Sequence, residues 1–130
     1  MKGYLALGAG LVVGIMIGAA AVTGLYAQAK PPIFVITEID ISDPEGYGKE
    51  FVPKAQAIKA VGAKLLAIGG VGSGAKPITS LEGTPPKRVT IQQWDSFDAL
   101  KVWYNGNDYQ EALTVGRKYA TFRRYAVEGR

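Results

Sequence analysis

The residue types that most often perform catalysis are partly missing from this chain. Its 130 residues include no Cys and no His. Disulfides, thiolate nucleophiles, zinc sites built from Cys and His, haem bound through His and every catalytic triad that uses His are therefore excluded. A proton-transfer mechanism would have to use Glu82, a Tyr or a Lys, and each needs a strongly shifted pKa to work near neutral pH. We expect no metal and no cofactor, and the composition disfavours acid–base catalysis.

Cationic side chains are the next candidates for chemistry. The chain has 15 Lys and Arg against 11 Asp and Glu, which is a mild excess. Binding to nucleic acid needs cations gathered on one face with little acid between them. The densest cationic stretch consists of Arg117, Lys118, Arg123, Arg124 and Arg130, with Glu128 among them. We expect this stretch to face solvent or a pocket, and we expect no nucleic-acid partner.

The N-terminal segment, residues 1–29, carries no charge between Lys2 and Lys30. Its apolar run from Tyr4 to Ala27 is long enough to span a bilayer as one hydrophobic helix, which needs about 20 residues. A buried helix of a cytoplasmic protein would normally show a polar face, and this segment has none. The segment is therefore predicted to be a signal peptide or a membrane anchor.

Two features of this segment favour different fates. Ala27-Gln28-Ala29 places small residues where signal peptidase reads them, which predicts cleavage after Ala29. The length of the apolar run and the small-residue spacing of Gly14 and Gly18 are typical of a retained transmembrane helix. In both cases Lys2 stays in the cytoplasm and the domain passes outward. We expect a periplasmic or other extracytoplasmic protein, secreted or anchored to the inner membrane.

Residues 30–130 are predicted to form one α+β domain. The expected strands are residues 33–40, 64–68, 88–94 and 119–127, with a short additional strand at 78–81. A first helix is expected over 44–61, with a kink at Pro53. A second helix begins after Asp95 or Ser96, is interrupted near residues 105–107 and restarts at Asp108. This order is the split βαβ arrangement of a ferredoxin-like fold, with an antiparallel sheet and both helices on one face.

The strand at 88–94 has two different faces. Its period-two alternation places Val89, Ile91 and Gln93 on one face, and Arg88, Thr90, Gln92 and Trp94 on the other. The first strand is apolar on both sides, so the sheet face without helices also needs a cover. We expect a second copy of the chain to supply it, related by a two-fold axis.

Several short motifs at consistent spacing resemble those of the domain of unknown function 1330 family. They are Ile39 to Tyr47, Phe51 to Lys54, Gly62 to Leu66, Leu81 to Gly83, Pro85 to Arg88, Trp103 to Asn105, Asp108-Tyr109 and Val127 to Gly129. The resemblance implies a ferredoxin-like domain that pairs into a dimeric α/β barrel. Cofactor-independent monooxygenases and chlorite-dismutase-like proteins share this fold. The resemblance implies no particular reaction.

The same resemblance singles out polar and aromatic positions as a candidate site. These are Glu82, Arg88, Trp103, Tyr104, Tyr109 and Arg117. Glu82 is a weak candidate for a catalytic base, or it pairs with Arg88. Forked donors on Arg88 and Arg117 suit an anionic ligand, unless they pair with Glu82 or Asp108. The three aromatic residues form a pocket wall or pack in the core.

Three functions stay open from the sequence. The first is a dimer that binds a small organic or anionic ligand without converting it. The second is a cofactor-independent enzyme, monooxygenase-like or isomerase-like, acting in the same pocket. The third is a structural dimerisation module, for which the interface itself is the function.

Overall fold

The computed structural model of the chain describes residues 30–130. The predicted signal peptide or anchor, and the predicted cleavage after Ala29, lie outside the described residues. Among residues 30–130, no helix combines the length and the apolar character that crossing a bilayer requires.

Four strands form one antiparallel sheet. They are β1 (Ile33–Ile41), β2 (Ala63–Gly70), β3 (Arg88–Trp94) and β4 (Ala120–Glu128), in the order β2-β3-β1-β4. Strand β1 pairs with β3 on one side and with β4 on the other. The predicted strands are thus found within one to two residues of their expected ends, and the split βαβ, ferredoxin-like topology is confirmed.

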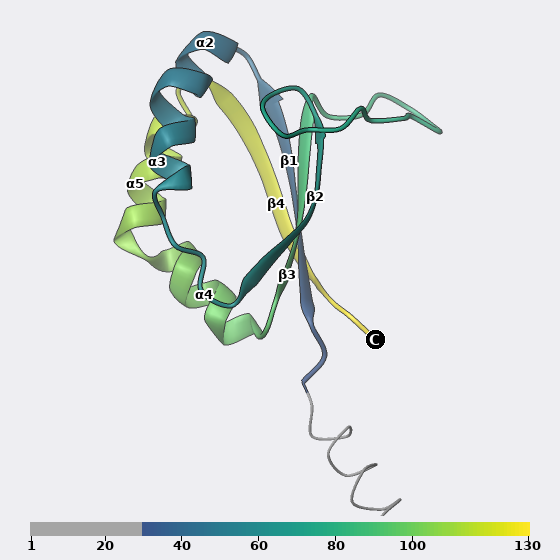
Figure 1. The fold of residues 1–130 in the computed structure, drawn as a ribbon, viewed down its shortest axis with the longest axis vertical. Coiled ribbons are helices and arrows are strands. Elements are labelled where there is room, and N and C mark those ends of the chain that lie inside the picture. The colour runs from purple at the N-terminus through teal and green to yellow at the C-terminus, as the bar shows by residue number, and fades with distance from the viewer. Residues whose placement is uncertain (1–29) are drawn as a thin grey trace, which may run out of the picture. The chain divides into compact units, whose positions relative to one another are not determined.

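The helical segments all lie on one side of this sheet (Figure 1). They are α2 (Pro44–Gly46), the π-helical turn η1 (Tyr47–Phe51), α3 (Val52–Gln56), α4 (Phe97–Asn105) and α5 (Asn107–Gly116). Within residues 30–130, no helix covers the opposite face of the sheet (Figure 1). We call this uncovered side the open face.

Alternation along β1 decides which residues meet the helices. Ile33, Val35, Thr37, Ile39 and Ile41 are buried on the helical side. The register aligns Ile36 of β1 with Ile91 of β3 and Tyr125 of β4, so these three side chains share the open face. The two-faced pattern predicted for β3 is therefore present, and its polar face, with Arg88, Thr90 and Gln92, is the one under the helices.

The first helical segment differs from the continuous kinked helix predicted over 44–61. The irregularity lies before Pro53, in η1, where the Val52 N–H donates to the Tyr47 carbonyl five residues back. Pro53 has no N–H to donate, so it begins a new short helix, α3, instead of continuing the old one. The wider turn buries Tyr47 and Phe51, with ring centroids 5.0 Å apart.

Two further predictions of secondary structure were wrong. The helix ends at Gln56, because the next six residues return the chain to β2 and Gly62 accepts a hydrogen bond from Asp95 N–H at 2.9 Å. Residues 78–81 form no strand, and the loop between β2 and β3 makes only a single bridge, Gly69 to Lys76. Pro77 lacks the N–H that would continue this pairing, and Leu81 is 92% exposed.

The apolar core is divided into two clusters. One contains Ile39, Ile41, Tyr47, Phe51, Ala112 and Ala120. The other contains Ile33, Val35, Trp94 and Leu100. Between them on β1 lies Thr37, which is polar and 2% exposed. One polar residue in the middle of the sheet thus separates the two apolar clusters.

A candidate ligand cavity between the sheet and the helices

A cavity of about 350 Å³ lies between the sheet and the helices. Its size falls within the ~300–1,000 Å³ range that small-molecule sites occupy. Thr37 lines it, which places the cavity at the division between the two core clusters. Its other polar and aromatic lining residues include Tyr47, Arg88, Thr90, Gln92, Trp103, Tyr109 and Arg124.

The sheet side of the cavity is built on one row of aligned residues. Thr37 on β1 is opposite Thr90 on β3 and Arg124 on β4. Arg124 Nε donates a hydrogen bond to Thr37 Oγ1 at 2.9 Å. Thr37 is therefore a buried polar residue with a defined role, because it fixes the orientation of the Arg124 guanidinium.

The helical side supplies an aromatic wall. The rings of Trp103 on α4 and Tyr109 on α5 lie 4.0 Å apart between centroids, and Tyr104 is 5.7 Å from Tyr109. Arg124 Cζ is 4.8 Å from the Tyr109 ring centroid and 5.6 Å from that of Trp103. These distances allow cation–π attraction, which holds the cation against the wall.

Two polar atoms in this wall are buried without a hydrogen-bond partner. They are Trp103 Nε1 and Tyr109 Oη. Buried polar groups are nearly always paired with protein or water, because an unpaired one costs about 1–3 kcal/mol. Burial raises the pKa of Tyr109 above its ordinary value, although the positive charge of Arg124 and the approach of its N–H donors to the hydroxyl oxygen oppose that shift. The Tyr109 hydroxyl therefore stays protonated near neutral pH and is available as a donor.

Arg88 lies on the other side of β1 from Arg124. Its Nη1 donates to the carbonyl of Val71 at 2.7 Å, which ties it to the start of the loop after β2. Burial raises the pKa of Tyr47, and the charge of Arg88 opposes that shift. The cavity thus has a guanidinium on each side of the central strand.

No carboxylate is among the residues that line the cavity within the described part of the chain. The ion pairs there are elsewhere: Lys49 with Glu45 at 2.7 Å on the outer side of the helices, and Arg123 with Glu38 at 2.8 Å on the open face. Residues 30–130 also contain no cluster of three Asp or Glu side chains that could hold a metal ion. The local charge of the cavity is therefore positive.

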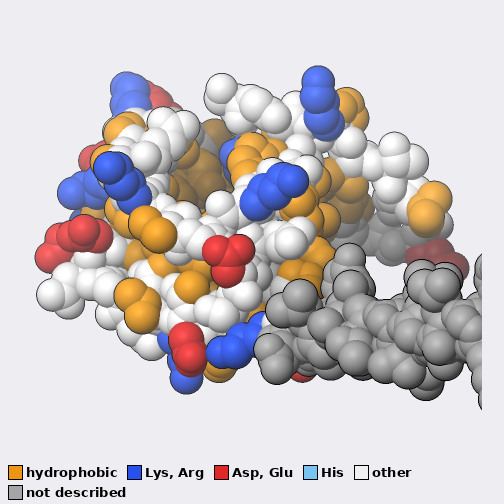
Figure 2. Space-filling view, turned by 60° about the horizontal axis from the view of Figure 1, so that its bottom comes forward, with side chains coloured by type: hydrophobic (Ala, Val, Ile, Leu, Met, Phe, Trp, Pro, Cys, Tyr) orange, Lys and Arg blue, Asp and Glu red, His pale blue; other side chains and the backbone are white. Residues whose placement is uncertain are grey.

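A surface depression of about 340 Å³ shares Ile58, Trp103 and Tyr109 with the cavity. The connection after α3 and the junction of α4 with α5 form its sides. The two spaces therefore share part of one wall. Figure 2 shows hydrophobic side chains exposed between interspersed positive and negative groups, with no continuous basic surface on the face of residues 30–130 that it presents.

The structure brings together some of the predicted site residues and separates others. Arg88, Trp103 and Tyr109 line the cavity, and Tyr104 packs against Tyr109 without lining it. Glu82 is exposed in the loop between β2 and β3, and Arg88 bonds Val71 there instead of pairing with Glu82. Arg117 is exposed at the end of α5, and within residues 30–130 it has no ion pair with Glu82 or Asp108.

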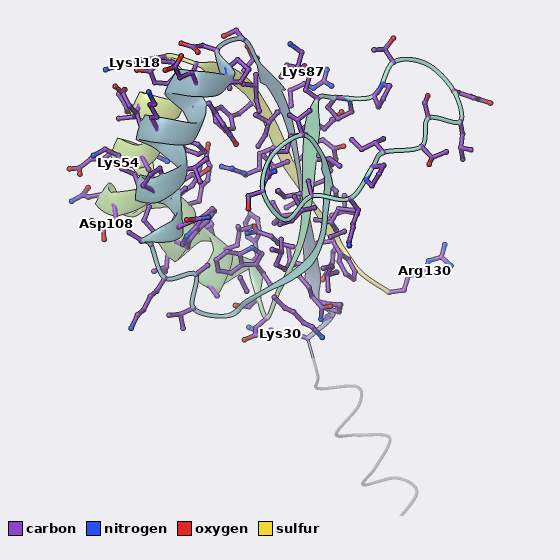
Figure 3. All side chains as sticks on the ribbon, turned by 45° about the horizontal axis from the view of Figure 1, so that its top comes forward. Lys30, Lys54, Lys87, Asp108, Lys118 and Arg130 are labelled. Carbon is purple, nitrogen blue, oxygen red and sulfur yellow. The ribbon has the colours of Figure 1, made fainter. Side chains whose placement is uncertain are left out.

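Labelled charges on the helical layer, Lys54, Asp108 and Lys118, lie on its outer side in Figure 3, away from the sheet.

Sequence reasoning missed Arg124 as a specific ligand-binding candidate, and it also missed Thr37 and Tyr47. The alternation of β4 carries the missing signal, because Arg124 shares a face with Phe122 and Ala126, opposite Arg123 and Tyr125.

Comparison with solved structures gives the same fold. A protein of unknown function from Rhodopseudomonas palustris matches with a TM-score of 0.52 and 18% identity, over 82% of this chain and 92% of that one. SnoaB, a cofactor-independent oxygenase from Streptomyces nogalater, matches with a TM-score of 0.52 and 13% identity, over 77% and 94%. A dimeric protein of unknown function with a ferredoxin-like fold from Bacteroides fragilis matches with a TM-score of 0.51 and 13% identity, over 75% and 96%.

No curated protein matches this chain. Residues 32–130 match the family described as Domain of unknown function (DUF1330), which agrees with the resemblance seen in the sequence motifs. Since this match covers most of the chain and the topology is ferredoxin-like, the protein belongs to the DUF1330 family.

Proposed function

We propose that this protein binds a small organic or anionic ligand in the cavity between the sheet and the helices. The observation that carries the proposal is the pair of buried, unpartnered donors, Trp103 Nε1 and Tyr109 Oη, in the wall of a cavity of ligand size. A ligand that accepts from these atoms would remove the energetic cost of leaving them unpaired. Apolar lining from Val52, Ala55 and Leu65 suits an organic body.

Binding is favoured over catalysis by the groups available. Within the described residues the cavity has no carboxylate or Lys to act as a base, and the raised pKa values of Tyr47 and Tyr109 keep their hydroxyls protonated. A cofactor-independent enzyme, the alternative function, would need a substrate that ionises or reacts with oxygen without a protein base. The likeness to SnoaB is one of fold at 13% identity and does not carry its activity over.

We also propose that the working form is a homodimer closed through the open face. The central row of that face contains Ala67, Ile91, Ile36 and Tyr125, which is an apolar surface without a cover from residues 30–130. The Bacteroides fragilis protein with this fold is described as dimeric, which supports the proposal. A purely structural dimerisation module would use the same face but would leave the cavity donors unexplained.

We propose further that residues 1–29 export the domain to the periplasm or another extracytoplasmic space. The support is the uncharged apolar run between Lys2 and Lys30 and the Ala27-Gln28-Ala29 site. Fractionation of cells that express the full chain, with mass measurement of the product, tests this. A mature N-terminus at Lys30 indicates cleavage, and an intact Met1 in the membrane fraction indicates an anchor. Recovery of the intact chain from the cytoplasm contradicts export.

Ligand binding is tested by blocking the cavity. Ala55 lines it, and an Ala55→Trp variant should fill much of the space. The matched control is Lys54→Trp, which adds the same ring on the outer side of the helices (Figure 3). Thermal shift against a panel of small metabolites should show stabilisation of the native chain and of Lys54→Trp, and none of Ala55→Trp. An equal response from all three proteins contradicts a ligand site in this cavity.

A further inference from the structure

We infer that the ligand of this cavity is an organic carboxylate, with its carboxylate held by Arg124 and Tyr109 and its apolar body directed toward α3 and β2. The inference rests on the proposed function, because it assigns a chemical class and an orientation to the same cavity. It goes further in naming the group recognised and the residues that recognise it.

The first step is the orientation of the Arg124 guanidinium. Its Nε is used by Thr37 Oγ1 at 2.9 Å. In the described part of the chain the guanidinium makes no ion pair, so its charge is not neutralised, and its remaining donors lie beside the Tyr109 hydroxyl. Two parallel N–H donors match the two oxygens of a carboxylate. Since Thr37 is 2% exposed and itself held within β1, the fork is oriented before any ligand arrives.

The second step is the grouping of donors beside that fork. The Tyr109 ring lies 4.8 Å from Arg124 Cζ and 4.0 Å from the Trp103 ring, between centroids. Tyr109 is 3% exposed, and neither its hydroxyl proton nor the Trp103 Nε1–H has an acceptor in the protein. Donors of this kind with no acceptor among them require an acceptor from outside. A negatively charged oxygen satisfies the hydroxyl and the cation together.

The third step separates a carboxylate from a free inorganic anion. Away from the fork, the cavity is lined by apolar side chains, among them Val52, Ala55, Leu65 and Ile68. Inorganic phosphate would leave this surface in contact with water and gain nothing from it. An apolar body would bury it at about 25 cal/mol per Å². The apolar surface therefore indicates that the ligand is an organic anion, and the planar guanidinium indicates that its charged group is a carboxylate.

The test compares matched pairs of probes on the purified full-length chain. The carboxylates are benzoate, 4-phenylbutyrate and octanoate, and the neutral partners are the corresponding amides. Inorganic phosphate is included as an anion without an apolar body. Isothermal titration should give tighter binding of at least one carboxylate than of its amide by about 10- to 100-fold, which is the effect of one charge-assisted pair. Phosphate should bind more weakly than that carboxylate.

Three variants locate the head group. Arg124→Gln should remove the preference for carboxylate over amide, and Arg124→Lys should restore only part of it, because a Lys ammonium lacks the fork. Tyr109→Phe should weaken carboxylate binding about tenfold and leave amide binding less affected. Lys118→Gln is the control, since it removes one positive charge from the outer surface without touching the cavity (Figure 3).

The outcomes distinguish this inference from the proposed function. If amides bind as tightly as carboxylates, and Ala55→Trp abolishes both, the cavity binds ligands but the carboxylate assignment is wrong. If no carboxylate of the panel binds, or if Arg124→Gln keeps the full preference, the assignment is also wrong. If Ala55→Trp leaves carboxylate binding intact, the site is not this cavity and both proposals fail. Because a Gln variant could lose its fold, circular dichroism of Arg124→Gln should match that of Arg124→Lys.

Discussion

Arg124 and Tyr109 show what can and cannot be inferred about single residues from the sequence. Tyr109, Arg88 and Trp103 were identified from the sequence and line the cavity. Arg117 was preferred over Arg124, although it lies exposed at the end of α5. The choice between two arginines seven residues apart depends on where β4 begins, at Ala120, and on the phase of its alternation, which places Arg124 on the helical side of the sheet. That phase is fixed by pairing with β1, which is a long-range property.

Replacement of the Tyr109 hydroxyl should weaken ligand binding without lowering the stability of the protein. The Oη atom is buried and unpartnered, so Tyr109→Phe should leave the free energy of unfolding of the ligand-free protein unchanged or raise it by about 1 kcal/mol. The same variant should bind carboxylates more weakly. Urea denaturation without ligand measures the first effect. A clear loss of stability would show instead that the hydroxyl has a partner inside the protein.

The stability of the protein should also depend on pH through its buried tyrosines. Burial raises the pKa of Tyr109 above 10.0, the value it returns to on unfolding. Below about pH 10 both states hold the proton and the contribution to stability is complete. Above it the unfolded chain loses the proton while the folded chain keeps it, so the free energy of unfolding falls as the pH rises.

Denaturation at several pH values between 9 and 11 measures this slope. Tyr109→Phe and Tyr47→Phe should each make the decline above about pH 10 shallower, because each removes one group with a raised pKa. An unchanged slope in both variants would contradict burial of the two hydroxyls.

At the scale of elements, local rules predicted where helices begin better than where they end. Ser96 caps α4, as expected, with its Oγ accepting from Ala99 N–H at 3.1 Å. The first helix was expected to run to residue 61, but it ends at Gln56 after the π-helical turn. Capping depends on neighbouring residues, whereas that helix ends where the chain must turn back to pair Ala63 with Trp94. Only the folded sheet supplies that constraint.

Loss of the Ser96 cap should weaken the element that carries the aromatic wall. Ser96→Ala should lower the free energy of unfolding by about 1 kcal/mol, because the Ala99 N–H at the start of the helix loses its acceptor. Ser80→Ala is the matched control, since Ser80 bonds only Gly83 within the exposed loop. Chemical denaturation should give a lower free energy of unfolding for Ser96→Ala than for Ser80→Ala. Equal effects would show that the cap adds nothing to α4.

At the scale of the whole domain, the ferredoxin-like fold followed from the order of the elements in the sequence. The cavity did not follow, because it results from the division of the core at Thr37. In the sequence, Thr37 is a single polar residue within the first, largely apolar strand. Its importance emerges only when Thr90 and Arg124 are aligned beside it.

A charge in the middle of the open face should prevent the proposed dimer. Ile36 lies between Ile91 and Tyr125, so Ile36→Lys would bury an unpaired cation in the interface. Light scattering after gel filtration should give a dimer for the native chain and a monomer for Ile36→Lys. Val102→Lys, at an exposed apolar position on α4, is the control and should stay dimeric. A native chain that is already monomeric would contradict the proposed dimer.

The open face has a further consequence for the cavity on its other side. If a second copy covers Ala67, Ile91 and Ile36, folding and dimerisation are thermodynamically coupled. By mass action, the unfolding midpoint then rises with protein concentration. A ligand held between sheet and helices would stabilise that assembly in turn. The abundance of the protein in its compartment would thus set how much ligand it retains, and dilution alone would release it.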